Sequence, residues 1–318
     1  MKDLVSIIVT SYNHAEYLKQ RINSLLCQTY SNAEIIVVDD CSTDGSRDVL
    51  NEYRNQENVA IVVLEQNKGY ATASNLGVSM AKGEYVMFAE CDDFSEPSQV
   101  EVLYNALHSN NSAVVAYCRS NMVDGKGILH GDDFKFRETL FKKMCSTDRL
   151  IPQKLILRFL MFSCVVPNMS AAMFRKSSFY AIGGVSPAFR ACADWDFWCR
   201  MAATGDFYYV SKPLNNFRSH STTVRSTFKI SLQLCEIFRI VYSVYAKTHL
   251  SFGERLKFRF NTGFIWASFS VEQPKNWVMG FPKVWIESLK YDKAGVFFLL
   301  AGFLLRFVVF LQNRLSIK

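Results

Sequence analysis

The sequence predicts an α/β protein in which a mostly parallel β-sheet is flanked by helices and followed by a helical C-terminal extension. Short apolar runs rich in β-branched residues alternate with segments of helical periodicity over the first 120 residues. Such unbroken apolar strands are typical of parallel sheets covered on both faces. From Ile230 onward the pattern changes to long helical segments. We therefore expect one region at 1–227, with halves at 1–120 and 121–227, and a second at 228–318.

Each expected strand of the first half is a run of four to six mostly apolar residues. These strands are Val5–Thr10, Ile35–Val38, Val59–Leu64, Tyr85–Ala89 and Ala113–Cys118. Between them, apolar residues three and four positions apart, such as Leu18, Ile22 and Leu25, predict helices. Ser42 or Thr43 is expected to cap the second helix.

The second half of the first region is less regular. The polar segment 125–149 is expected to form a loop or a short excursion. Further strands are expected at Met169–Phe174 and Phe207–Ser211, with a helix at Trp195–Ala203 between them.

The composition excludes several protein classes and divides unevenly along the chain. Of the 318 residues, 49% are hydrophobic, which is too many for a disordered chain. The net charge of +7 comes from the last region, since 228–318 holds 13 Lys and Arg against 5 Asp and Glu. Basic residues also flank the apolar run Ala294–Leu311. We expect this run to lie in the cytoplasmic leaflet of the membrane, with a single span or a buried core helix as alternatives.

Two further features bear on location and partners. The apolar run Leu4–Val9 is too short for a signal peptide, and the nine cysteines form no Cys-x-x-Cys pair. A reducing, cytoplasmic setting at the inner face of the membrane is therefore expected. The basic residues accompany apolar helices rather than a basic and aromatic groove, so nucleic acid is not an expected partner.

Polar clusters follow four of the expected elements. They are Thr10–Asn13, Asp39–Asp40, Asn67–Gly69 and Glu90–Asp93. In open α/β sheets, ligands bind outside the carboxyl ends of the strands, so these clusters predict one site at one edge of the sheet.

Each of these residues has a functional and a structural interpretation. Tyr12 can stack on a planar base or pack as a surface tyrosine. The carboxylates of Asp39 and Asp40 can accept hydrogen bonds from a nucleoside or cap a helix. Asp92 and Asp93 can bind a hard divalent cation or form a solvated turn.

Two later segments also carry candidate residues. Asp194 and Asp196 flank Trp195, where a carboxylate among aromatic rings can act as a general base or stabilise a helix N-terminus. His220 can ligate a metal, contact a phosphate or be a loop histidine.

The order of these motifs resembles glycosyltransferase family 2. The resemblance rests on Val5–Asn13, Glu34–Asp44, Asn67–Gly69 with Asn75, and Phe88–Asp93, followed by Ile182–Gly184, Asp194–Arg200 and Phe217–His220. It covers roughly residues 4–222. It implies a GT-A fold and an inverting transfer from a nucleotide sugar, most often a UDP-sugar.

The resemblance also implies roles for individual residues. Asp194 matches the catalytic base, and Asp92, with Glu90 and His220, matches the site of a divalent metal, Mn²⁺ or Mg²⁺. The residues that match the nucleotide-sugar site are Thr10, Tyr12, Asp39, Asp40, Asn67, Lys68, Asn75 and Cys91. The chain departs from the family in having Glu90 where Asp is frequent, and Ala193 where an acidic residue is frequent.

The implied function is transfer of a hexose or N-acetylhexosamine from a UDP-sugar to a hydroxyl of a saccharide acceptor. A polyprenyl-diphosphate-linked acceptor in bacterial O-antigen, capsule or other surface polysaccharide synthesis would suit a membrane-associated C-terminal region. Two alternatives remain open: a polyprenyl-phosphate sugar synthase of the same family, and a sugar-nucleotide binding protein without catalytic activity.

Overall fold

A computed structural model describes residues 2–137, 139–219, 229–272, 274–293, 297–299 and 301–302, without the side chains of 136 and 268–281. The chain forms two compact units. The first contains the described parts of Met1–Ile156, Val165–Ala188 and Asp196–Ser221. The second contains Leu157–Cys164, Phe189–Trp195 and the described residues from 229 onward.

The first unit is built on one mixed β-sheet in which most paired residues lie in parallel ladders. Its strands follow the order β3-β2-β1-β4-β9-β6-β10-β5, with β7 paired to β6 and β8 paired to β10. The strands are β1 (Val5–Ser11), β2 (Ala33–Asp39), β3 (Val59–Val63), β4 (Tyr85–Glu90), β5 (Phe94–Ser95), β6 (Ala113–Val123), β7 (Leu129–Asp132), β8 (Arg149–Ile151), β9 (Ala172–Arg175) and β10 (Asp206–Arg218).

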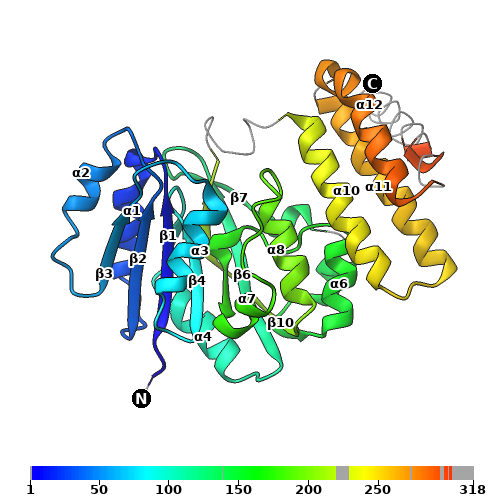
Figure 1. Ribbon diagram of the computed structural model, residues 1–318. Helices are drawn as coiled ribbons and strands as arrows, with labels where there is room; N and C mark the ends of the chain where they lie inside the picture. The colour runs from blue at the N-terminus through cyan, green and yellow to red at the C-terminus, as the bar shows by residue number, and fades with distance from the viewer. Residues whose placement is uncertain are drawn as a thin grey trace. The chain divides into compact units, whose positions relative to one another are not determined.

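Strands β1 to β4 are parallel to one another, so their carboxyl ends meet at one edge of the sheet (Figure 1). This confirms the predicted fold class. The helices of this unit are α1 (Ala15–Leu26), α2 (Ser46–Asn51), α3 (Tyr70–Met80), α4 (Gln99–His108), α5 (Thr139–Met144) and α7 (Lys176–Ala181), with short 3₁₀ turns at Asp133–Phe136 and Met169–Ala171. Two further helices, α6 (Gln153–Phe162) and α8 (Ala193–Ala202), have residues in both units.

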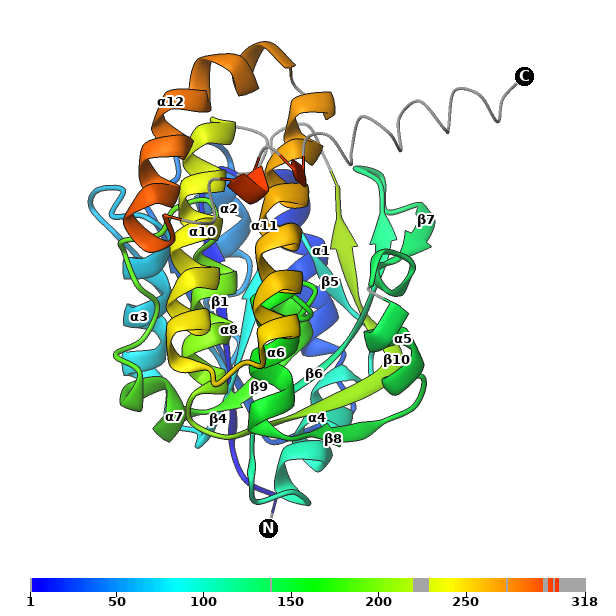
Figure 2. The ribbon, with the colours of Figure 1, turned by 90° about the vertical axis from the view of Figure 1, so that its right-hand side faces the viewer.

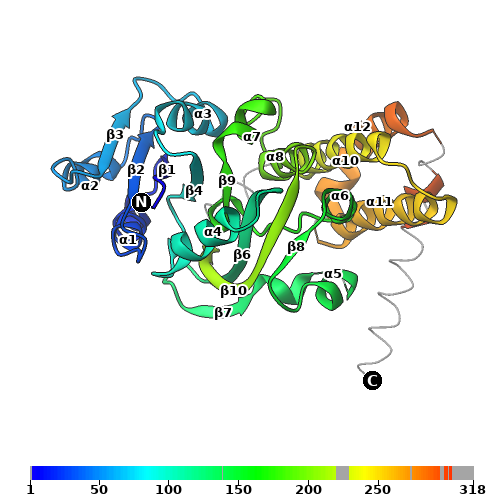
Figure 3. The same cartoon turned by 90° about the horizontal axis from the view of Figure 1, so that it is seen from below.

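Helices cover both faces of the sheet, as expected for apolar strands. Seen along the strands, α1 and α4 lie on one face, and α3 and α7 lie on the other (Figure 3). Side chains alternate along a strand, so Ile7 joins the core beneath α1 and α4, whereas Ile8 lies beneath α3. At Gly77, α3 comes so close to β1 that a Cβ atom would lie 2.3 Å from the Ile8 side chain. A larger residue would push α3 away from the sheet.

The second unit consists mainly of α10 (Ile230–Lys247), α11 (Phe252–Glu272) and α12 (Pro274–Tyr291), which pack against one another (Figure 2). The apolar stripe predicted on α10 is buried, with Leu234, Phe238 and Val241 at most 1% exposed. Arg259 of α11 forms a two-pronged ion pair with Asp292, which follows α12, at 2.6 and 3.1 Å.

Three local predictions were wrong. The segment 125–149 is more than a loop or a short excursion, because it contains β7, a 3₁₀ turn, α5 and the first residue of β8. Helix α2 begins only at Ser46 after Gly45, and Ser42 does not cap it because its backbone and hydroxyl bind Asp39 instead. The strand expected at Met169–Phe174 begins at Ala172, since the preceding three residues form a 3₁₀ turn.

Most of the apolar run Ala294–Leu311 lies outside the described residues. Within the part of the chain that the structure describes, none of the helices combines the length and apolar character needed to cross a bilayer.

Candidate active site

The polar clusters after β1, β2 and β4 lie side by side because these strands are in register. Thr10 pairs with Val38 on one side and with Glu90 on the other, and Ser11 pairs with Asp39. The chain therefore leaves β1 at Tyr12 between the ends of β2 and β4. The backbone of Tyr12 forms a hydrogen bond with the thiol of Cys91, whose pKa burial raises, while the side chain of Tyr12 is 43% exposed.

Asp39 and Asp40 are buried, and the carboxylate of each accepts at least one hydrogen bond from a backbone amide. Asp39 accepts hydrogen bonds from the amide and the hydroxyl of Ser42, at 2.9 and 2.6 Å. Asp40 accepts the amides of Lys68 and Gly69, at 2.7 and 2.8 Å. The pair thus fixes both the turn after β2 and the loop before α3, a role that the strand-end position alone did not reveal.

The loop before α3 exposes polar side chains toward solvent while its backbone is held. Asn67 and Lys68 are exposed, and Gly69 has a φ of 82°, a left-handed conformation that glycine adopts without strain. Lys68 therefore presents a positive charge beside the carboxyl end of β2, where Asp40 anchors its amide.

Asn75 has a contact that the sequence pattern did not suggest. From the middle of α3, its amide group donates to the carbonyl of Val185 at 3.0 Å and accepts the amide of Val185 at 2.8 Å. This contact holds the turn at Gly183 and Gly184, both of which have positive φ. The prediction that Asn75 contacts a nucleotide stays a prediction.

The acidic residues at the end of β4 differ in exposure. Asp93 is only 1% exposed and accepts the side-chain amide of Asn168 at 2.9 Å and the backbone amide of Arg218 at 3.0 Å. Burial, together with the charge of Asp92, raises the pKa of Asp93 to about 7. Glu90 and Asp92 are half-buried.

Two buried arginines lie against this acidic motif. Arg21 of α1 is fully buried and donates to the Ser95 hydroxyl at 2.9 Å. Burial lowers the pKa of Arg21, and the charges of Asp93 and Glu90 oppose that shift. Arg218 at the end of β10 donates to the carbonyl of Asp92 at 2.7 Å. The negative charges of Asp93 and Glu90 therefore offset part of the cost of burying Arg21, whereas carbonyl oxygens hold Arg218.

The sequence did carry one signal for Arg21. It sits on the apolar face of α1 with Leu18, Ile22 and Leu25, all buried, and a charged residue in such a stripe requires a buried partner. Arg218 is further fixed by the side chain of Gln20, 2.5 Å away.

The donor set at the end of β4 fits a hard divalent cation. Glu90 and Asp92 offer carboxylate oxygens, which Mg²⁺ and Mn²⁺ prefer. They adjoin the carboxyl of Asp93, whose pKa is raised by burial first and by the charge of Asp92 second. Within the described ranges, no group of three or more His, Cys, Asp and Glu side chains is arranged so that it could hold a metal ion. The third predicted ligand, His220, lies outside the described residues.

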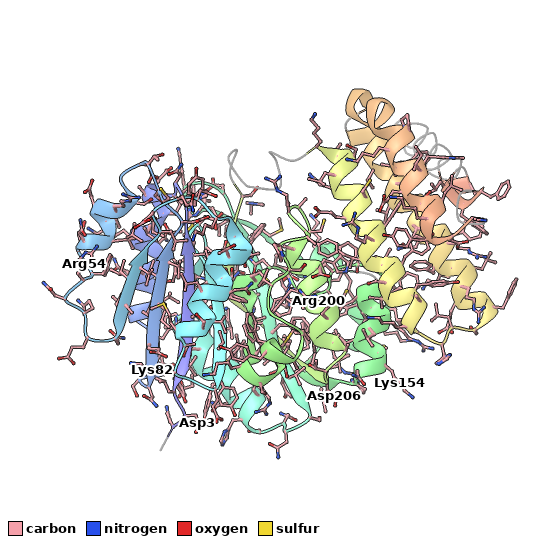
Figure 4. The ribbon with its side chains drawn as sticks, in the orientation of Figure 1. Asp3, Arg54, Lys82, Lys154, Arg200 and Asp206 are labelled. Carbon is pink, nitrogen blue, oxygen red and sulfur yellow. The ribbon has the colours of Figure 1, made fainter. Side chains whose placement is uncertain are left out.

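Asp194 and Asp196, which the sequence pattern treats alike, have different environments. Asp196 forms a two-pronged ion pair with Arg200 at 2.8 and 2.7 Å, and Arg200 also donates to the carbonyls at residues 182 and 184 (Figure 4). Asp194 is half-buried at the start of α8, and its carboxylate accepts the amide of the next residue, Trp195, at 2.8 Å.

Comparison with known proteins shows the family of the chain. Residues 6–183 match the model of "Glycosyl transferase family 2". The chain belongs to this family. GlyG of Streptococcus pneumoniae is 36% identical over 149 residues, which are 45% of this chain and 50% of that protein. The putative teichuronic acid biosynthesis glycosyltransferase TuaG of Bacillus subtilis is 43% identical over 101 residues, which are 31% of this chain and 40% of that protein.

The matched region therefore spans half of the length of GlyG and less than half of the length of TuaG. Among solved structures, S. aureus TarS in complex with UDP-GlcNAc superimposes with a TM-score of 0.67 at 18% identity, over 93% of this chain and 83% of that one. At this identity the likeness concerns the fold, and it confirms the expected GT-A fold of the family 2 member.

Proposed function

We propose that this protein is an inverting, metal-dependent glycosyltransferase that moves a hexose or N-acetylhexosamine from a UDP-sugar to a hydroxyl of a saccharide. The observation that carries the proposal is that the family match coincides with the cluster at one sheet edge. Tyr12, Asp39, Asp40 and Lys68 belong to this cluster, next to the acidic motif Glu90–Asp93. The UDP-GlcNAc complex of TarS, which shares this fold, supports UDP as the nucleotide.

The first unit would bind the donor. The exposed ring of Tyr12 offers a stacking surface for a planar base, and Asp39 and Asp40 each keep oxygen lone pairs beyond the backbone bonds they accept. Asp40 fixes the loop that carries Lys68, and a lysine there can pair with a diphosphate. Thr10, Asn67 and Cys91 complete the proposed wall of the site.

Glu90 and Asp92, with His220, would hold the metal. When bound, Mn²⁺ or Mg²⁺ supplies positive charge that stabilises the departing diphosphate. Asp93 does not serve as a ligand in this proposal, because its two oxygens already bind Asn168 and the backbone of Arg218.

Asp194 would act as the general base. Its carboxylate takes the proton of the acceptor hydroxyl while the hydroxyl oxygen attacks the anomeric carbon from the face opposite the leaving UDP. A single displacement inverts the configuration, so an α-linked donor gives a β-linked product.

We further propose a lipid-linked acceptor at the cytoplasmic face of the membrane. In the second unit, α11 and α12 expose apolar side chains at Phe252, Leu256 and Ile286, next to exposed Lys257 and Lys283. Apolar and basic side chains on one helical surface favour binding to anionic lipid. The similarity to TuaG, a putative teichuronic acid biosynthesis glycosyltransferase, supports an acceptor in surface polysaccharide synthesis.

The deciding experiment is a donor screen. Release of UDP is measured with a panel of UDP-hexoses and UDP-N-acetylhexosamines, Mn²⁺, and a polyprenyl-diphosphate-linked N-acetylhexosamine as acceptor. The expected result is acceptor-dependent UDP release that Asp194→Asn abolishes while UDP binding is kept. UDP binding without release from any donor would instead indicate a binding protein, and transfer to a polyprenyl phosphate alone would indicate a sugar-phosphate synthase.

A further inference from the structure

The short segment that precedes Asp194 is bound by one buried carboxylate of the C-terminal helices. Glu236 of α10 is 3% exposed. One of its oxygens accepts the amide of Arg190 at 3.0 Å, and the other accepts the amides of Ala191 and Cys192, both at 2.9 Å. Three consecutive backbone N–H groups thus converge on a single side chain within the second unit.

Neighbouring residues on the same side of α10 strengthen this contact. The thiol of Cys192 lies 3.9 Å from the carbonyl of Gln233, one turn before Glu236. The guanidinium of Arg239, almost one turn after it, lies 5.7 Å from the centre of the Phe189 ring. The segment 189–192 therefore follows the surface of α10 over two turns of that helix.

The residue after Asp194 is anchored as well. The indole N–H of Trp195 donates to the carbonyl of Leu160 in α6 at 2.8 Å, and α6 is tied to α11 by a hydrogen bond from Asn261 to the carbonyl of Phe162 at 3.1 Å. Asp194 thus lies between two fixed points, one on each side in the sequence. Both points belong to the helical unit.

We propose that Glu236 is a positioning residue for the general base, and that the C-terminal helices hold Asp194 through it. The inference rests on the proposed function, in which Asp194 takes the acceptor proton. A buried carboxylate is stable here because three amides donate to it. Without its charge, the amides of 190–192 lose their common acceptor and the start of α8 is released.

The test uses the full-length chain and the substitutions Glu236→Gln and Glu236→Asp. Gln keeps one acceptor oxygen but turns an NH₂ group toward backbone amides, whereas Asp keeps the charge and is one methylene shorter. The control is Asp292→Asn after α12, a half-buried carboxylate of the same unit, which pairs with Arg259 of α11 at 2.6 and 3.1 Å.

Three quantities are measured below the unfolding temperature: hydrogen exchange of the 190–192 amides, the Kd for UDP, and kcat for transfer per UDP-binding site. For Glu236→Gln we expect fast exchange at 190–192, a Kd for UDP within twofold of wild type, and kcat lowered by about 10- to 100-fold, because small displacements of a catalytic group have effects of that size. Glu236→Asp is expected to recover part of kcat. Asp292→Asn is expected to match wild type in all three quantities.

A purely structural role would lower the folded fraction and leave kcat per UDP-binding site unchanged, and that result would overturn the proposal. If Glu236→Gln does not fold, Glu236→Asp decides, since wild-type kcat together with fast exchange at 190–192 would also overturn it. The variant Asp194→Asn distinguishes a failure of the proposed function from a failure of the positioning role of Glu236. If that variant keeps full transfer activity, the proposed function fails; if it is inactive while Glu236→Gln is fully active, only the positioning role fails.

Discussion

The substitution Asp40→Asn tests whether the loop before α3 belongs to the nucleotide site. Asp40 is 4% exposed, and each of its oxygens accepts one backbone amide, from Lys68 and from Gly69, at 2.7 and 2.8 Å. Asn keeps one acceptor and places an NH₂ group against the other amide. A hydrogen bond to a charged group contributes about 1.5–3 kcal/mol, so the free energy of unfolding should fall by about that amount.

If the loop contacts the nucleotide, the free energy of UDP binding should also become less favourable. The loop that Asp40 no longer holds must then be ordered when UDP binds, and each 1.4 kcal/mol of that cost raises Kd about tenfold. We therefore expect Asp40→Asn to weaken UDP binding by about tenfold or more, as measured by titration calorimetry beside urea denaturation.

Glu34→Gln provides the matched control at the opposite end of β2. One oxygen of Glu34 accepts the Ser6 hydroxyl at 2.6 Å and the amide of Lys82 at 2.7 Å (Figure 4). This variant should lose stability and bind UDP as wild type does. Wild-type UDP affinity in Asp40→Asn would refute the placement of the loop in the site, and equal weakening in Glu34→Gln would show that the effect is general.

Three further predictions concern the carboxylates. Asp196→Asn should lower the unfolding temperature by a few degrees while keeping kcat, because it removes the ion pair between Asp196 and Arg200 within α8. A loss of kcat to the level of Asp194→Asn would contradict this. Removal of divalent metal with EDTA should abolish transfer, and added Mn²⁺ should restore it. Asp92→Asn should raise the Mn²⁺ concentration needed for half-maximal transfer. An activity that resists EDTA would count against the metal role. In metal-free protein, the raised pKa of Asp93, about 7, makes the folded state bind the proton more tightly than the unfolded state. Its favourable contribution is therefore complete below the unfolded pKa of about 4 and is lost as the pH rises through 7. Asp93→Asn should accordingly remove a fall of up to about 2–3 kcal/mol in unfolding free energy between pH 5 and 8, and urea titrations with the same pH slope in both proteins would contradict it.

The first four strands were predictable because each is a short apolar run bounded by polar turns. Strands β6 and β10 were predicted too short, since they continue through polar residues. Asn215 donates to the hydroxyl of Ser120 at 3.1 Å, and Asn121 donates to the side chain of Asn216 at 3.0 Å. These polar side chains form hydrogen bonds with one another across the two paired strands, and hydropathy read along a single segment does not detect such pairing.

The location of the candidate site was also predictable, but the direction of its side chains was not. Parallel strands bring their carboxyl ends together, so the clusters after β1, β2 and β4 had to meet. Which partner a carboxylate chooses depends on loops distant in sequence. Asp40 binds amides 28 and 29 residues away, and Asp93 binds the backbone of Arg218, 125 residues away. Glu236 lies in a helix that the sequence pattern connects only with the C-terminal region.

A common pattern links the two later acidic motifs. In Glu90–Asp93 and in Asp194–Asp196, the last carboxylate is buried and holds the structure: Asp93 binds Asn168 and the backbone of β10, and Asp196 binds Arg200. The carboxylate that precedes it, Asp92 or Asp194, is only half-buried. A carboxylate that must bind a cation or accept a proton needs access to its ligand together with a fixed backbone. In the proposed function, the buried residue would supply the fixed backbone, and its half-buried neighbour would bind the cation or take the proton. Substituting the buried member should therefore change stability first, and substituting the half-buried member should change the chemistry first.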